Sequence, residues 1–269
     1  MYFSPEVPGT VPLVCVNGGL LFDHNLLWPA LAPLAERRQL ILYDQRGRGA
    51  SQVPPAARSA RIEHDAGDLP ALRESLGLSR WDVLGHSWGG GLAMLATGRD
   101  QSAVRRLVLV DAVGPVGNWQ ENLLRDALPR LGPGDRAVLE HIDQPALLAP
   151  DPGVHSAYSR AMYPAWFADA SLAAMFSPPR SESAAGAAVA AKLRGEGYDW
   201  TPLLRAVSVP TLVLHGERDL LPVSVAREIV ATLGNARLEI IPDAGHMPFW
   251  ESPELFFTLV DSFLSTPSP

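Results

Sequence analysis

The sequence contains a single cysteine, Cys15, so no disulfide can form within the chain. Cys15 lies in an apolar, strand-like run at residues 13–16, where we expect a buried, unreactive thiol and not a nucleophile. No apolar run approaches the roughly 20 residues that cross a bilayer. Residues 1–10 also have no basic residue ahead of an apolar run, which a secretory signal would need. These absences predict a cytoplasmic protein that does not insert into a membrane.

Positive charge is also scarce, because the formal net charge is −7 and the arginines are scattered along the chain. Binding to nucleic acid requires a basic surface, so we expect no nucleic-acid partner. No cluster of cysteine, histidine and carboxylate residues has metal-ligand spacing. The pairs His64–Asp65 and His141–Asp143 are isolated, and we expect both at the surface. The sequence therefore predicts no metal and no cofactor, and it leaves the oligomeric state open.

What the sequence does contain is a regular alternation of short aliphatic, β-branched runs with helical patterns. This alternation predicts an α/β fold, with a doubly wound, mostly parallel sheet and helices on both faces. The expected strands are residues 13–16, 40–43, 81–84, 107–110, 211–214 and 238–241. The expected helices are residues 26–37, 62–76, 92–97, 223–233 and 254–264, and the tail at 265–269 should fray.

The alternation stops between residues 114 and 202, which contain no strand-like run. Helical patterns occur there at 121–131, 135–143, 154–167 and 181–193. We therefore predict a helical lid, residues 114–202, inserted between two strands of a core formed by residues 1–113 and 203–269. The lid is rich in aromatic residues and methionine. These side chains are expected to pack in its own core or to form the apolar underside of a lid.

Residues 81–91, WDVLGHSWGGG, combine an apolar strand, a Gly-x-Ser-x-Gly turn and the start of a helix. A serine on such a sharp turn is lifted above the sheet, and the glycines let the strand and the helix approach each other closely. The helix N-terminus also points at the reaction centre. We predict that Ser87 is a catalytic nucleophile. The alternative is an ordinary glycine-rich turn in which Ser87 only caps the helix.

A serine nucleophile needs a base and an orienting carboxylate, and each should follow a later strand. His246 follows the last expected strand in a loop rich in glycine and proline, and Asp219 follows the strand before it. The chain order Ser87, Asp219, His246 is typical of the strand–serine–helix turn described above. The carboxylates Glu217 and Asp111 remain rivals of Asp219.

The oxyanion of an acyl-transfer reaction also needs donors. One should be the backbone N–H of Trp88, the residue after the nucleophile, and the other should come from the loop after an early strand. In the loop at residues 16–20 we select Gly19, with Gly18 and Leu20 as alternatives. Leu20 and Met247 flank this predicted site, and we expect them to line an apolar acyl pocket.

Five segments resemble the α/β-hydrolase superfamily in the same order. They are residues 17–19 (NGG), 43–51 (YDQRGRGAS), 85–90 (GHSWGG), 215–219 (HGERD) and 245–246 (GH). Within the superfamily, residues 43–47 and 87–90 are similar to the proline iminopeptidase branch. The resemblance implies the α/β-hydrolase fold and a serine hydrolase activity without a cofactor. It also implies that Asp44 and Arg46 are structural residues beside the site. Residues 1–4 are expected to form at most the end of one strand, and whether the superfamily's first strand is absent stays open.

The sequence departs from the iminopeptidases where they carry a proline after the paired glycines, because this chain has Leu20. The iminopeptidases also bind the substrate amine with lid glutamates. No motif marks the lid residues Glu121, Glu140, Glu182 or Glu196 for that role. The first expectation is therefore an esterase for a small, fairly apolar carboxylic ester. The alternatives are a proline iminopeptidase-like aminopeptidase acting on a short peptide or amide, and a non-catalytic ligand-binding protein of the same fold.

Overall fold

The computed structural model describes residues 1–266, so the predictions for residues 267–269 lie outside the described part of the chain. One sheet has the strand order β1-β3-β2-β4-β5-β6-β7, and every neighbouring pair is parallel except β1 and β3. The strands are β1 Tyr2–Phe3, β2 Leu13–Val16, β3 Leu40–Leu42, β4 Trp81–His86, β5 Val104–Val110, β6 Thr211–Gly216 and β7 Ala236–Ile241. The predicted α/β fold with a mostly parallel sheet is confirmed.

Strands β2, β3, β4 and β6 are buried along their whole length. Because successive side chains of a strand point in opposite directions, both faces of the sheet are covered there. In β2, Val14 and Val16 belong to one apolar cluster, and Leu13 and Cys15 belong to another on the opposite face. Burial raises the pKa of the Cys15 thiol, as expected for an unreactive cysteine.

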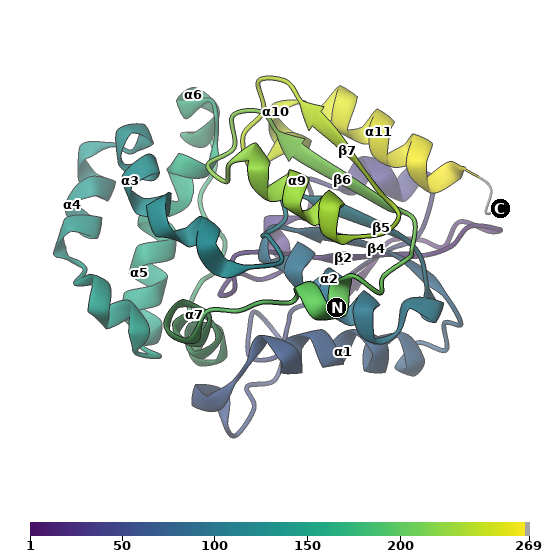
Figure 1. Ribbon diagram of the computed structural model, residues 1–269, viewed down its shortest axis with the longest axis horizontal. Helices are drawn as coiled ribbons and strands as arrows, with labels where there is room; N and C mark the ends of the chain where they lie inside the picture. Colours follow the sequence, from purple (N-terminus) through teal and green to yellow (C-terminus); the bar gives the residue numbers. More distant parts are fainter. Residues whose placement is uncertain (267–269) are drawn as a thin grey trace.

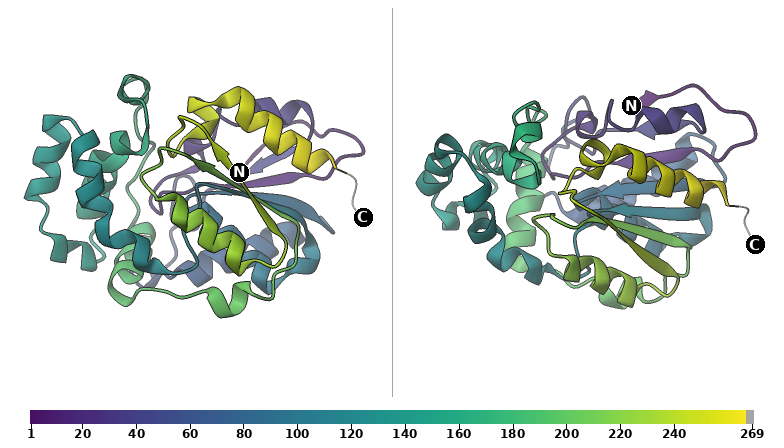
Figure 2. Two further views of the ribbon diagram at one scale, coloured as in Figure 1. Left: turned by 45° about the horizontal axis from the view of Figure 1, so that its top comes forward. Right: turned by 90° about the horizontal axis from the view of Figure 1, so that it is seen from above.

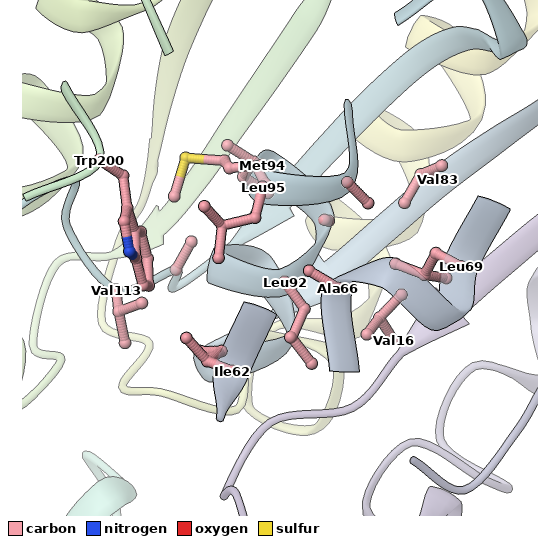
Figure 3. Close-up of a cluster of buried hydrophobic side chains, with 14 of the residues drawn as sticks. Val16, Ile62, Ala66, Leu69, Val83, Leu92, Met94, Leu95, Val113 and Trp200 are labelled. Atoms are coloured by element: carbon pink, nitrogen blue, oxygen red, sulfur yellow. The ribbon is translucent and has the colours of Figure 1, made fainter. Parts of the chain in front are cut away.

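Helices cover each face of the sheet (Figure 1). The first cluster includes side chains of α1 (Ile62–Ser75), α2 (Trp88–Arg99) and α9 (Val223–Thr232). Figure 3 shows part of it, with Ile62 and Ala66 of α1 beside Leu92 of α2. The second cluster includes the 3-10 turns η1 (His24–Leu26) and η2 (Ala32–Glu36) and the last helix, α11 (Pro253–Ser265), which lies beside them in Figure 2.

The prediction of one helix over residues 26–37 is wrong, since this stretch forms the two short turns η1 and η2. Pro29 and Pro33 explain the difference, because proline has no N–H to donate and its ring clashes with the preceding helical turn. Three further short helices connect the core elements: η3 (Ala57–Ser59), η4 (Gln101–Ala103) and α10 (Pro248–Glu251). None of the helices in residues 1–266 is long and apolar enough to span a bilayer.

The chain between β5 and β6 forms helices that gather at one end of the sheet (Figures 1 and 2). They are η5 Gly117–Asn122, α3 Leu123–Ala127, η6 Leu128–Arg130, α4 Pro133–His141, η7 Gln144–Leu148, α5 Pro152–Met162, η8 Tyr163–Trp166, α6 Ala170–Ala173 and α7 Ala184–Glu196. The last helix before β6, α8 Thr201–Leu204, lies away from this group and packs against α2. The two ends of this insertion meet, because Val116 bridges to Asp199 and the Trp200 N–H donates to the Pro115 carbonyl at 2.8 Å. The limits 114–202 stay a prediction.

The buried centre of the sheet leads to a stability prediction. Leu212 lies in β6 between β5 and β7 and is fully buried. Leu212→Ala should lower the free energy of unfolding by about 2–5 kcal/mol, because the cavity left behind cannot close fully. Leu148→Ala is the control, since Leu148 is 54% exposed, and it should change stability by less than about 0.5 kcal/mol. Urea unfolding followed by circular dichroism measures both, and equal effects would contradict the assigned core.

Candidate active site

Ser87 lies where β4 ends and α2 begins, in a backbone conformation that few side chains adopt. Its φ of 56° and ψ of −124° fall in a sparsely populated region for any residue other than glycine. The Ser87 N–H donates to the Val110 carbonyl of β5 at 2.9 Å, which ties the turn to the neighbouring strand. The sharp strand-to-helix turn expected from the sequence is present.

Three glycines make this turn possible because other parts of the chain approach them closely. A Cβ on Gly85 would overlap the carbonyl oxygen of Gly89, and a Cβ on Gly89 would overlap the carbonyl oxygen of Val16. A Cβ on Gly18 would lie 2.6 Å from the Cβ of Ser87. The loop after β2 therefore lies directly against Ser87, and only glycine fits there.

His246 and Asp219 meet although 27 residues separate them. The His246 Nδ1 lies 2.9 Å from the Asp219 Oδ2, with both side chains buried. The His246 N–H donates to the Trp166 carbonyl at 2.8 Å, and the two rings lie 4.4 Å apart between centroids. Of the rival carboxylates, Glu217 is exposed and accepts from the Asp243 N–H at 3.3 Å. Asp219 is thus the carboxylate that faces the imidazole.

The electrostatics of this pair favour an ionised carboxylate. Burial raises the pKa of Asp219, but the facing His246 with its hydrogen bond, together with His215 and a hydrogen bond from Asp111, holds that pKa below its ordinary value. The His86 Nε2 donates to the His246 carbonyl at 2.8 Å. Burial, and then the neighbouring His246, lower the pKa of His86 to about 3, so His86 stays neutral and acts as a fixed donor. No pattern in the sequence indicates this contact.

The structure contains a buried group of three titratable side chains, Asp111, His215 and Asp219. The sequence does not reveal this group, although Asp111 was considered there as an alternative to Asp219. One nitrogen or oxygen atom of each side chain lies within 4.8 Å of the other two. Within residues 1–266, this is the one group of three or more such side chains that is close enough to hold a metal ion. However, Asp219 already faces His246, and the His215 Nε2 donates to the Leu221 carbonyl at 3.0 Å. We therefore interpret the group as two carboxyls that share one proton.

The proton resides on Asp111. Burial, and then the charge of Asp219, raise the pKa of Asp111 well above its ordinary value. The Asp111 Oδ1 accepts from the Gly216 N–H at 2.8 Å, while its Oδ2 finds no donor among the described residues. A protonated Oδ2 can donate to Asp219, which satisfies the otherwise unpaired oxygen.

The predicted oxyanion donors lie around Ser87. Trp88 is the first residue of α2, where a helix leaves its N–H groups without partners and where its dipole favours negative charge. Gly19 has a φ of 77°, and Leu20, at 42°, is a non-glycine residue with positive φ. Gly19, Leu20 and Trp88 line one cavity together with Ser87 and His246.

The loop that carries Gly19 and Leu20 is held from behind by a buried ion pair. The Arg48 Nε donates to the Leu20 carbonyl at 2.7 Å, and the Arg48 guanidinium lies 2.8 Å from Asp65. The prediction that Asp65 lies at the surface is therefore wrong. His64 beside it is exposed, but Asp65 points inward because the buried Arg48 needs a counter-charge.

The residues expected to be structural are indeed engaged in holding loops. Asp44 accepts from the backbone N–H groups of His24 and Ala50, at 2.8 and 2.9 Å, and Arg46 pairs with Asp68. Neither Asp44 nor Arg46 lines the cavity at Ser87.

The cavity at Ser87 has a volume of about 110 Å³, below the roughly 300–1,000 Å³ of pockets for drug-sized ligands. Leu20 and Met247 both line it, and their role in an acyl pocket stays a prediction. Most of the lid residues that line it are apolar or aromatic: Trp119, Leu123, Tyr158, Met162, Tyr163 and Trp166. Among the described residues, no aspartate or glutamate lines the cavity, and the four lid glutamates considered above all lie outside it.

A family model described as the α/β-hydrolase fold matches residues 11–253. The chain belongs to the α/β-hydrolase fold family. The hydrolase is 28% identical to a proline iminopeptidase of Lactobacillus delbrueckii subsp. bulgaricus, over 96% of this chain and 91% of that protein. It is 30% identical to a 2-hydroxymuconate semialdehyde hydrolase of Pseudomonas putida, over 86% of this chain and 78% of that protein.

Solved structures show the same fold for the hydrolase. The crystal structure of a proline iminopeptidase from Mycobacterium smegmatis superposes with a TM-score of 0.74 at 22% identity, covering 98% of this chain and 93% of that one. At this identity the likeness shows the fold alone. The predicted resemblance to the proline iminopeptidase branch is confirmed by the relative from L. delbrueckii.

The close approach at Gly89 can be tested by adding one carbon atom. In Gly89→Ala of the hydrolase, the new Cβ meets the Val16 carbonyl, and neither backbone can move freely, so we expect a loss of at least about 1–3 kcal/mol of stability. Gly134→Ala in α4 is the matched control, because a Cβ there meets nothing within 4 Å. Chemical denaturation measures both, and a neutral Gly89→Ala would show that the turn is looser than described.

The shared proton predicts an unusual pH dependence. Because the pKa of Asp111 is raised on folding, the folded hydrolase keeps a proton that the unfolded chain loses above about pH 4. Above that pH, the contribution of Asp111 to the free energy of unfolding should therefore fall by up to about 1.4 kcal/mol for each pH unit. An asparagine side chain cannot ionise, so the stability of Asp111→Asn relative to the wild type should rise between pH 4.5 and pH 7.5. Urea unfolding at several pH values measures the difference. Asp143→Asn, at an exposed carboxylate, is the control, and a constant difference for Asp111→Asn would exclude a raised pKa.

Proposed function

We propose that the hydrolase cleaves a small, fairly apolar carboxylic ester through an acyl-enzyme on Ser87. The observation that carries this proposal is the composition of the cavity that Ser87 and His246 share. Its walls are mainly apolar, and no described carboxylate lines it. A protonated amine in this cavity would find no anion to pair with, whereas an ester needs none.

In the proposed reaction, His246 is the general base. Its Nδ1 faces Asp219, so the opposite nitrogen, Nε2, accepts the proton of the Ser87 hydroxyl as the serine oxygen attacks the ester carbonyl. Asp219, ionised beside it, holds the ring and stabilises the imidazolium that forms. The imidazolium then protonates the departing alcohol, and an acyl-enzyme remains. A water molecule, activated by His246 in the same way, releases the carboxylic acid.

The negative charge that develops on the carbonyl oxygen is assigned to the N–H groups of Trp88 and Gly19. Trp88 begins α2, so its N–H and the helix dipole act in the same direction. The Arg48 contact to the Leu20 carbonyl fixes the loop that contains Gly19, which keeps the second donor in place before substrate binds. We assign residues 114–202 to the lid that closes the cavity, and no metal or cofactor takes part in this scheme.

A second candidate is an aminopeptidase that removes N-terminal proline from a short peptide or amide. The similarity to the iminopeptidase of L. delbrueckii favours it. The absence of a carboxylate from the described cavity lining counts against it, because an N-terminal amine carries a positive charge. A non-catalytic binding protein of the same fold is the third possibility, and it predicts no turnover at all.

Removal of the Ser87 hydroxyl tests the mechanism. Ser87→Ala should reduce kcat for p-nitrophenyl butyrate by roughly 10³- to 10⁶-fold, because the attacking oxygen is lost while the donors and the pocket remain. A fluorophosphonate probe should label the wild type and not the variant. Ser79→Ala, at an exposed serine, is the control and should keep full activity.

Two results would contradict the proposal. Near-normal ester hydrolysis by Ser87→Ala would exclude the serine mechanism. Faster cleavage of prolyl p-nitroanilide than of the ester by the wild type would favour the aminopeptidase instead.

A further inference from the structure

Arg194 stands out in the cavity at Ser87 because it is, histidines aside, the single ionisable basic residue lining the cavity in the described chain. We propose that Arg194 binds a carboxylate of the substrate, so that the preferred ester carries an anionic group at the end of a short apolar chain. The ester part of this inference rests on the proposed function, whereas the carboxylate part rests on the surroundings of Arg194.

The position of Arg194 follows from one face of α7. Gly186, Ala190 and Arg194 are spaced four residues apart, so they lie on the same side of the helix. A Cβ on Gly186 would lie 2.6 Å from the Leu20 carbonyl, which places this end of α7 against the predicted oxyanion loop. Ala190 and Arg194 both line the cavity. Eight residues of helix span about 12 Å, so the backbone of Arg194 lies well beyond the predicted oxyanion loop, and its long side chain enters the cavity from that far end of α7.

Arg194 has no anionic partner within residues 1–266. No described carboxylate lies within 4.0 Å of it, and the nearby Glu196 is paired with Arg61 at 2.9 Å. The Arg194 Cζ lies 5.2 Å from the centre of the Tyr158 ring, so an aromatic face supports the guanidinium without neutralising it. A half-buried guanidinium with unused donors is well suited to hold a carboxylate by two parallel hydrogen bonds.

No other group in the described lining changes this charge balance. His155, on α5, is buried beside Arg194, and its Nε2 donates to the Ala149 carbonyl at 3.0 Å. Burial lowers the pKa of His155, and the charge of Arg194 adds to that effect, so the imidazole stays neutral. Polar but uncharged groups of Gln120 and Ser159 complete this part of the lining. This part of the cavity therefore presents the positive charge of Arg194, which attracts a carboxylate and repels an ammonium group.

The test compares esters that differ in one carboxylate. Mono-p-nitrophenyl glutarate and p-nitrophenyl valerate place the difference in the acyl part, and 4-carboxyphenyl butyrate and phenyl butyrate place it in the leaving group. In Arg194→Gln, the ratio of kcat/KM for the charged ester to that for the neutral ester should fall by about 10- to 100-fold in at least one pair. For Arg194→Lys this ratio should lie between those of the wild type and of Arg194→Gln, because lysine keeps the positive charge but lacks the planar guanidinium that makes two parallel hydrogen bonds.

Arg160→Gln is the matched control for net charge. Arg160 lies on α5, is exposed and does not line the cavity, so its loss should change each ratio by no more than about twofold. The inference is overturned if Arg194→Gln keeps the wild-type ratio in both pairs. Ester hydrolysis and probe labelling of Ser87 would then still support the proposed function.

Failure of the proposed function gives a different result. If the wild type cleaves none of the four esters and Ser87 is not labelled, the esterase proposal has failed. Binding of glutarate then tests the carboxylate site separately. The inference is supported if glutarate raises the melting temperature of the wild type and of Arg160→Gln but not that of Arg194→Gln. An equal response of all three proteins, or no response, overturns the inference.

Discussion

The backbone of Ser87, held in a conformation with positive φ, is the constraint on which the site depends. A strand can turn this sharply into a helix only if both elements approach each other without side chains between them, and Gly85, Gly89 and Gly18 leave that space. The hydrogen bond from Ser87 to β5 and the dense packing of the parallel sheet hold the strained turn in place. The strain is therefore balanced by the fold as a whole and not by neighbours of Ser87 alone.

Buried polar groups hold the loops around Ser87 in place. Arg48 and Asp65 hold the Leu20 carbonyl, and His86 holds the His246 carbonyl, so the loops on both sides of Ser87 are anchored through their backbones. The buried charge of Arg48 has its counter-charge in Asp65, and the donating nitrogen of His86 has its acceptor, which avoids the cost of an unpaired charge or donor. A protonated Asp111 fits the same logic, because two adjacent buried carboxylates cannot both be ionised at low cost.

Much of the core and of the candidate site could be predicted because strand ends are visible in the sequence. Ser87, Asp219 and His246 each follow a short apolar run, and in a parallel sheet such ends lie at one edge. The direction of Asp65 and the approach of Asp111 to Asp219 could not be predicted, because both depend on partners distant in the chain. The lid face that carries Arg194 was also invisible, since α7 is largely alanine and glycine and shows no clear apolar stripe.

Chemistry and selectivity consequently reside in different parts of the molecule. The groups assigned to bond cleavage lie at the ends of β2, β4, β6 and β7, where the sheet fixes them, whereas most of the cavity walls come from helices inserted between β5 and β6. A substitution of Arg194 on α7 can change the charge of the cavity without removing either partner of the contact between His246 and Asp219. The net charge of −7 makes the surface repel anions at long range. A carboxylate would therefore be selected by the short-range geometry of Arg194, inside the cavity, and not by attraction to the protein as a whole.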